Sequence, residues 1–86
     1  MSWSIQWTDA ALRDLRRLDR SVAQRVVGKL DAAAKHPERY FERLARSNDY
    51  KRRVGDYRLL ALLAPNEHTL VVLRADHRRR VYDRSR

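Results

Sequence analysis

Three cations in one short stretch are the residues of this sequence best suited to chemistry. Residues 50–60 read Y-K-R-R-V-G-D-Y-R-L-L, two alternating runs joined by a Gly-Asp pair. This pattern predicts a β-hairpin with a two-residue loop. Side chains alternate along each strand, so Lys51, Arg53 and Arg58 are expected to share one face, with Arg53 directly opposite Arg58.

The two faces of the predicted hairpin differ in polarity. The other face is mostly apolar and comprises Tyr50, Arg52, Val54, Tyr57, Leu59 and Ala61. Like charges directly opposite each other destabilise a strand pair, so the pairing of Arg53 with Arg58 suggests that an anion binds between them. A solvated basic face, turned outward with both side chains in water, is the alternative interpretation.

RNA is the anion that suits this set of cations. Its 2′-hydroxyl can attack the neighbouring phosphate, so a protein need only align the attack, accept a proton and neutralise the phosphorane. Lys51 and Tyr82 are the proton acceptors that the sequence offers, because Arg stays protonated and can only stabilise charge. His77 is a further candidate for proton transfer, because a histidine side chain ordinarily changes charge near neutral pH, although a lone exposed histidine usually has no such role. Arg79 and Arg80 are expected to add unspecific attraction to phosphates.

The composition favours a polyanionic partner. The 86 residues include 20 Lys and Arg against 11 Asp and Glu, a formal net charge of +9, and 17 of the cations are Arg. Arginine binds phosphate in a bidentate manner, although a genomic bias toward arginine codons would give the same count. Cysteine is absent, the histidines lie far apart and only two glycines occur. We therefore expect no disulfide, no metal, no glycine-rich phosphate loop and no cofactor.

The length and the N-terminus bear on location and domain count. A chain of 86 residues is expected to form a single domain, residues 1–86, with a thin core. The start M-S-W-S-I-Q-W lacks the basic and apolar regions of a signal peptide, and no window is long and apolar enough to span a membrane. We expect a soluble protein of the cytoplasm, where cysteine-free chains are common.

The chain before the hairpin predicts one strand and two helices. Aromatic and aliphatic residues alternate with polar ones over residues 3–7, which is typical of a strand with one buried face. Thr8 is a good N-cap for an amphipathic helix over residues 9–18. A second amphipathic helix is expected over residues 20–35, and so short a link predicts that the two helices pack as an antiparallel pair.

The ends of the second helix carry their own signals. Either Asp19 begins it, or Ser21 does so in a capping box with Gln24. Pro37 disfavours helical geometry in the residue before it and is expected to end the helix.

Residues 38–49 are expected to form a loop anchored to the core by Tyr40, Phe41 and Leu44. After the hairpin, a turn at residues 65–68 and a β-branched run from Thr69 to Ala75 predict another strand, followed by a basic tail.

The predicted order is therefore βααβββ. We expect an α+β fold in which a helical hairpin packs on a small, mainly antiparallel sheet.

Two motifs resemble the RelE/ParE toxin superfamily, in particular the RelE-type mRNA interferases. Residues 50–60 resemble its central hairpin, and residues 72–82, V-L-R-A-D-H-R-R-R-V-Y, resemble its last strand and tail. The resemblance implies a toxin that cleaves mRNA in the ribosomal A site without a metal and is held inactive by a cognate antitoxin.

The resemblance also implies residue roles. Its catalytic set falls on Lys51, Arg53, Arg58, Arg78 and Tyr82. Arg53 and Arg58 would hold the phosphate, Lys51 or Tyr82 would help remove the 2′ proton, and Arg78 would assist the leaving group electrostatically. We expect further RNA contacts from Arg52, His77, Arg79 and Arg80.

Three positions depart from the family pattern. Arg52 stands where an apolar or aromatic residue is usual, so its guanidinium must reach solvent or find a carboxylate. Arg53 replaces the Lys of some members, and Asp76 replaces a small residue, usually Gly, and could pair with a cation.

Two other functions fit the same residues. ParE-like relatives share the fold but poison DNA gyrase and typically lack the catalytic set, and a basic RNA-binding module without catalysis is the third interpretation. In the toxin interpretation, Leu60 and Leu62 lie beside the cations and need a cover. We therefore expect an acidic, partly disordered antitoxin that binds there.

Overall fold

The computed structural model describes residues 2–44 and 49–77, and of His77 only the backbone. Its elements in chain order are β1 (Ser4–Trp7), α1 (Asp9–Arg17), α2 (Arg20–Ala33), α3 (Pro37–Tyr40), β2 (Glu42–Arg43), β3 (Asp49–Val54), β4 (Tyr57–Ala64), the 3-10 turn η1 (Pro65–Glu67) and β5 (Thr69–His77). The α+β class is confirmed, and the predicted order is present with α3 and β2 added between the long helices and the hairpin.

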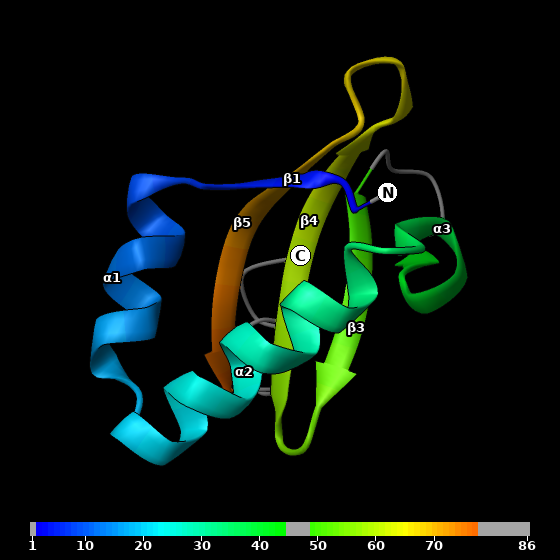
Figure 1. Ribbon diagram of the computed structural model, residues 1–86. Coiled ribbons are helices and arrows are strands. Elements are labelled where there is room, and N and C mark those ends of the chain that lie inside the picture. The colour runs from blue at the N-terminus through cyan, green and yellow to red at the C-terminus, as the bar shows by residue number, and fades with distance from the viewer. Residues whose placement is uncertain (1, 45–48, 78–86) are drawn as a thin grey trace.

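The described strands form one sheet in the order β1-β5-β4-β3-β2 (Figure 1). β1 pairs with β5 in parallel, and each of the other neighbouring pairs is antiparallel. The mainly antiparallel sheet predicted from the sequence is confirmed, and the first strand lies beside the last.

The hairpin of β3 and β4 has the register that its sequence predicts. Val54 pairs with Tyr57 at the loop, and the pairing continues to Lys51 opposite Leu60. Of the two loop residues only Gly55 has a positive φ, 59°, which fits a type II′ turn. Glycine adopts this conformation without the clash that a Cβ would cause.

A bulge in β5 decides which of its side chains face the helices. Leu60 pairs with Arg74, but the next residue, Ala61, pairs with Val72. Leu73 is therefore an extra residue without a partner on β4. This shift keeps Val72 fully buried in the core while Arg74 lies on the other face with Leu60.

The helices cover one face of the sheet. In Figure 1, α1 runs down beside β5 and α2 rises across the sheet toward β3. Both helices contribute to a core that also includes one residue after α3 and residues of β3, β4 and β5. Its buried members are Ala11, Val26, Leu30, Ala33, Phe41, Val54, Leu59, Ala61, Leu70, Val72 and Ala75. We call the opposite face the back face. Of the described helices, none is both long and apolar enough to cross a membrane.

The starts of both helices are confirmed, and of the two alternatives for α2 it is Asp19 that begins the helix. The Thr8 hydroxyl accepts the Ala11 N–H at 3.1 Å, as an N-cap should. The N-cap of α2 is Asp19, so Ser21 lies inside the helix and the predicted capping box with Gln24 does not form. The α2 helix ends at Ala33, earlier than predicted.

The segment predicted as a loop contains two short elements. Pro37 does not merely end α2 but begins α3, where its missing N–H is no loss. Phe41 is buried as predicted, with 4% of its surface exposed. The prediction for Tyr40 is wrong, because Tyr40 is 44% exposed. Since Phe41 enters the core directly after α3, the preceding ring is turned outward.

Candidate functional site

Four cations of the hairpin line one hollow of about 220 Å³. It lies where the short strand β2 ends opposite Lys51, and in the described part of the chain no strand pairs with this edge of β3 beyond that point. Its lining consists of Tyr40, Glu42, Lys51, Arg52, Arg53 and Arg58. We call this the cationic hollow. The structure thus brings together the three hairpin cations predicted as catalytic and adds Arg52 to them.

A row of charges crosses the sheet at the tip of the hairpin. Arg53 on β3 lies opposite Arg58 on β4, and Arg58 in turn lies opposite Asp76 on β5. Arg58 and Asp76 are 8% and 7% exposed, whereas Arg53 is exposed. The alternative interpretation, in which both arginines lie in water, is therefore wrong for Arg58. Burial of a charge is tolerated where an opposite charge lies near it, and Asp76 lies on the flank of Arg58.

The Lys51 ammonium lies near a carboxylate of the next strand. Its Nζ is 4.0 Å from Oε2 of Glu42, and the two side chains are 27% and 77% exposed. An exposed pair at this distance contributes little to stability. Glu42 can therefore move aside at small cost when an anion enters the cationic hollow.

Arg52 meets an aromatic ring rather than the carboxylate or open solvent that the sequence suggested. Its guanidinium carbon lies 5.0 Å from the centroid of the Tyr40 ring, within the range of a cation–π contact. Its Nη1 donates to the Tyr40 carbonyl at 3.4 Å. The pair links the end of α3 to the open edge of β3.

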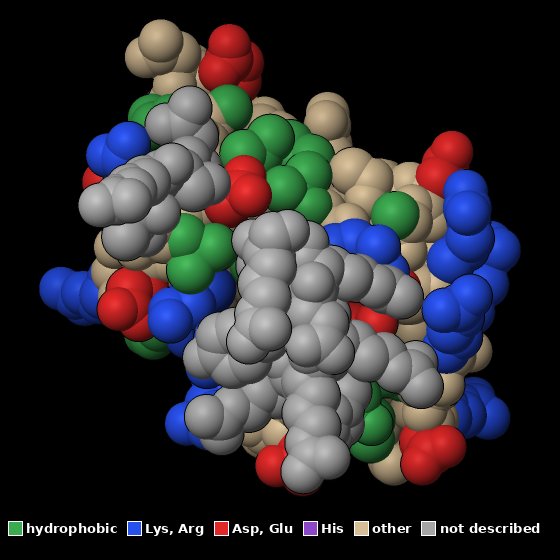
Figure 2. Space-filling model, turned by 180° about the vertical axis from the view of Figure 1, so that it is seen from behind, with side chains coloured by type: hydrophobic (Ala, Val, Ile, Leu, Met, Phe, Trp, Pro, Cys, Tyr) green, Lys and Arg blue, Asp and Glu red, His purple; other side chains and the backbone are tan. Residues whose placement is uncertain are grey.

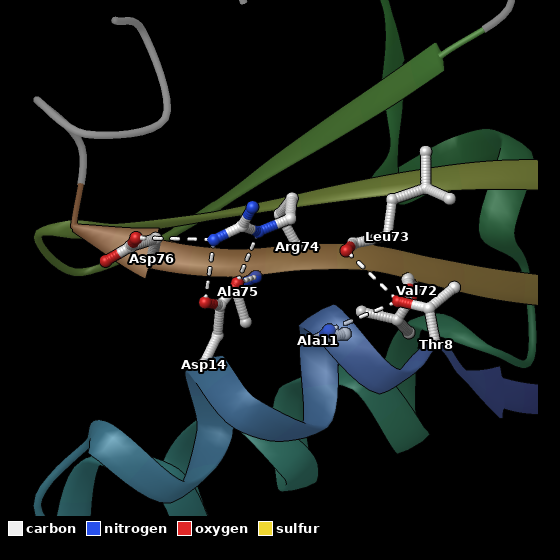
Figure 3. Close-up of polar contacts among 8 residues, drawn as sticks. All are labelled: Thr8, Ala11, Asp14, Val72, Leu73, Arg74, Ala75 and Asp76. Atoms are coloured by element: carbon white, nitrogen blue, oxygen red, sulfur yellow. Dashed lines mark hydrogen bonds and ion pairs between the residues drawn. The ribbon is translucent and has the colours of Figure 1, made fainter. Parts of the chain in front are cut away.

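The far end of β5 is held to α1 by a buried carboxylate (Figure 3). Asp14 accepts hydrogen bonds from Arg74 Nε at 2.7 Å, Arg74 Nη2 at 2.9 Å and the Ala75 N–H at 3.0 Å. The hydrogen bonds from the guanidinium to Asp14 raise the pKa of Arg74 above its ordinary value. Arg74 Nη2 also lies 3.9 Å from Asp76 Oδ2, so Asp76 pairs with a cation as the sequence suggested.

The same strand edge is closed further along by Thr8. β1 pairs only with residues 69–72 of β5, so among the described residues no strand lies beside the edge of β5 beyond Val72. The Thr8 hydroxyl lies 2.9 Å from the Val72 carbonyl and 3.1 Å from that of Leu73. Together with Asp14, it supplies partners for backbone groups that would otherwise be exposed on an edge strand.

Several predicted site residues lie outside the described part of the chain. These are Arg78, Arg79, Arg80 and Tyr82, together with the side chain of His77. The backbone of His77 ends β5 and pairs with Tyr57.

The two predicted partner-binding leucines share the back face with the cations. Leu62 is 36% exposed and Leu60 is half-buried. On this face, Figure 2 shows hydrophobic side chains exposed close to Lys and Arg side chains. Leu60 lies between Lys51 and Arg74 in the strand pairing, so an apolar side chain separates two cations.

Sequence reasoning missed three residues that shape this region. Glu42 lies on a strand of two residues that no periodic pattern can reveal. Tyr40 was assigned to the core because aromatic residues usually pack there. The signal that could have located Asp14 is an acid inside the apolar stripe of the first helix, since a buried acid requires a cation.

A second depression is larger but carries less chemistry. It measures about 380 Å³ and is lined by Trp3, Lys35, His36, Pro37, Glu38, Arg39 and His68. No cation of the hairpin reaches it, and its charged side chains are exposed. Among the described residues, no group of three His, Cys, Asp or Glu side chains is placed to hold a metal ion.

The match to a known protein family covers almost the whole chain. Residues 5–82 match the family described as the ParE toxin of the type II toxin–antitoxin system parDE. The curated Toxin RelG of Mycobacterium tuberculosis is 32% identical over 87 residues, which cover 98% of this chain and 100% of that protein.

Solved structures with the same fold include toxins in complex with their antitoxins. In the toxin–antitoxin complex RelBE2 from Mycobacterium tuberculosis, one chain superposes with a TM-score of 0.85 at 31% identity, covering 91% of this chain and 93% of that one. A chain of the intact RelBE complex of E. coli has a TM-score of 0.76 at 19% identity, covering 88% and 96%. This second likeness concerns the fold alone.

Proposed function

The chain belongs to the RelE/ParE family of toxins of type II toxin–antitoxin systems, and on that premise we propose that it is an endoribonuclease. Its proposed substrate is mRNA that is bound to ribosomes in the cytoplasm. The observation that carries this proposal is the convergence of Lys51, Arg53 and Arg58 on one open hollow. Cations placed in advance around a phosphate stabilise the charge that develops in the transition state.

The chemistry that these residues support is attack by the substrate's own 2′-oxygen. The 2′ oxygen bonds to phosphorus, the bond to the 5′ oxygen breaks, and a 2′,3′-cyclic phosphate remains. Arg53 and Arg58 hold the phosphate and neutralise the phosphorane. Lys51 as the neutral amine, or Tyr82 as the phenolate, accepts the 2′ proton. The leaving 5′ oxygen takes up a proton from water, and Arg78 stabilises its developing negative charge. The reaction requires no metal, because the substrate supplies the nucleophile and the arginines supply the positive charge.

The partner that we propose is a cognate antitoxin, acidic and partly disordered before it binds. The solved relative RelBE2 is a toxin–antitoxin complex, and this chain carries a net charge of +9. Leu62 is 36% exposed on the back face, beside the cations. A partner with apolar and acidic side chains would cover both and block access to the phosphate site.

A second function is favoured by one observation. The matching family is described as the ParE toxin of parDE, and ParE-like relatives poison DNA gyrase. In that case the cationic hollow would contact DNA or gyrase without catalysis. The two functions differ in their outcome: a nuclease leaves cleaved mRNA, whereas a gyrase poison leaves mRNA intact.

Incubation with translating ribosomes and a defined mRNA tests the proposal. We expect cleavage that leaves a 2′,3′-cyclic phosphate, detected by sequencing the product ends. Arg53→Ala and Arg58→Ala should each lower the cleavage rate by about 10² or more, the scale of one preorganised contact. Because Arg58 is buried, we add Arg58→Lys as a second variant at this position. It keeps the positive charge and loses only the planar set of guanidinium N–H donors.

The control is Arg16→Ala, which removes an exposed cation of α1 that does not line the cationic hollow. Its rate should equal that of the wild type. Intact mRNA together with inhibition of gyrase on supercoiled DNA would reject the nuclease in favour of the ParE-like function. A loss confined to Arg79→Ala and Arg80→Ala would contradict the role given to the hairpin.

A further inference from the structure

The lining of the cationic hollow includes one aromatic ring, together with the cations that we propose to bind phosphate. Tyr40 is the most exposed large hydrophobic side chain among the described residues, at 44%, and it lines the hollow together with Arg53 and Arg58. An exposed tyrosine alone is unremarkable on a protein surface. Its position at the edge of a set of cations distinguishes this one.

The Tyr40 ring is held in place by Arg52. The guanidinium lies over the ring at 5.0 Å, and its Nη1 donates to the carbonyl of the same residue at 3.4 Å. Within the described part of the chain, Arg52 Nε is buried and has no hydrogen-bond partner. The Arg52 guanidinium thus stays against the Tyr40 ring although its Nε–H has no acceptor among the described residues. A ring fixed in this way loses little further freedom when a ligand stacks on it.

A planar ring beside a phosphate site matches the chemistry of single-stranded RNA. Successive nucleotides present a phosphate and then a flat base, and proteins that bind single strands stack such bases on aromatic rings or on arginine planes. The cations and the ring lie in one hollow of about 220 Å³, so neighbouring groups of one nucleotide chain can reach both.

We propose that Tyr40 and Arg52 form a stacking site for the nucleobase next to the scissile phosphate. This rests on the proposed function, since it takes RNA as the substrate. The site contributes affinity and selects single-stranded RNA, because a base paired in a duplex is not free to stack. It does not take part in bond breaking, which stays with the cations of the hairpin.

A short RNA that cannot be cleaved tests the stacking site directly. The oligonucleotide carries a 2′-O-methyl group at the scissile position, which blocks the nucleophile, and 2-aminopurine as the neighbouring base, whose fluorescence falls on stacking. Binding to the wild type should quench this fluorescence. Tyr40→Leu should weaken binding about tenfold and abolish the quenching, whereas Tyr40→Phe should retain both.

A second oligonucleotide, abasic at the same position, separates stacking from damage to the fold. The wild type and Tyr40→Leu should bind it equally, since the group that stacks is missing. Arg52→Gln should weaken binding of the 2-aminopurine RNA more than Arg39→Gln does, although each removes one charge. Arg39 lies next to Tyr40 but does not line the cationic hollow, so it is the matched control.

The outcomes distinguish this inference from the proposed function. Equal affinity of the wild type and Tyr40→Leu for the 2-aminopurine RNA, with Arg58→Ala still weakening it, would overturn the stacking site and leave the nuclease intact. No binding of either RNA by the wild type, together with intact mRNA on ribosomes, would overturn both.

Discussion

Removing the Asp14 carboxylate should loosen the strand that carries one flank of the site. The Asp14 side chain is 2% exposed and joins α1 to two neighbouring residues of β5. Asp14→Ala deletes three hydrogen bonds at once: two from the Arg74 guanidinium and one from the Ala75 N–H. After this substitution, the Ala75 N–H and the Arg74 guanidinium differ in whether water can replace the carboxylate.

The Ala75 N–H is the larger loss. Its hydrogen bond to Asp14 is buried, so water does not replace the carboxylate, and an unsatisfied buried donor costs about 1–3 kcal/mol. The Arg74 side chain is 28% exposed and can turn to water, so only part of a charged hydrogen bond, about 1 kcal/mol, is lost there. We expect the free energy of unfolding to fall by about 3 kcal/mol. For a domain of this size that lowers Tm by about 12 °C or more.

Urea and thermal unfolding followed by circular dichroism measure this loss. Arg74→Ala should also destabilise the protein, because it leaves the buried Asp14 carboxylate with the Ala75 N–H and without its cation. The double variant should show a coupling energy above about 0.5 kcal/mol, since the two residues share an interaction.

Asp31→Ala removes an exposed acid of α2 and is the matched control, with an expected change within about 0.5 kcal/mol. If Asp14→Ala is no more destabilising than this control, the carboxylate does not hold β5 to the helix and the reasoning fails.

Two further predictions concern single positions. Gly55→Ala should destabilise the protein by about 1–2 kcal/mol, because Gly55 has a φ of 59°. Gly28→Ala should instead stabilise it by about 0.5–1 kcal/mol, because a Cβ there meets nothing within 4 Å. Urea midpoints that move in the same direction for both variants would contradict this prediction. Asp76→Asn removes a negative charge opposite Arg58 and should tighten binding of uncleavable RNA severalfold at low salt, with the difference shrinking as salt rises. Weaker binding by Asp76→Asn would instead show that Asp76 holds Arg58 in position.

The hairpin could be predicted from the sequence because its determinants are local. Side-chain alternation and a glycine at the turn set the register, and the pairing of Arg53 with Arg58 follows from counting outward from the loop. The N-cap at Thr8 was readable for the same reason, since a cap acts within one turn of its helix. Three of the cations that line the hollow could therefore be named in advance.

What the tertiary structure decided depends on contacts between residues far apart in the chain. Asp14 and Ala75 are separated by 61 positions, and neither residue type indicates the other. The exposure of Tyr40 follows from the burial of Phe41 beside it, and the burial of Arg58 follows from its place between β3 and β5. The bulge at Leu73, which places Arg74 on the back face, is defined by the pairing of β5 with β4. Periodicity determines which face a side chain takes within its own strand, whereas pairing and packing determine what it meets there.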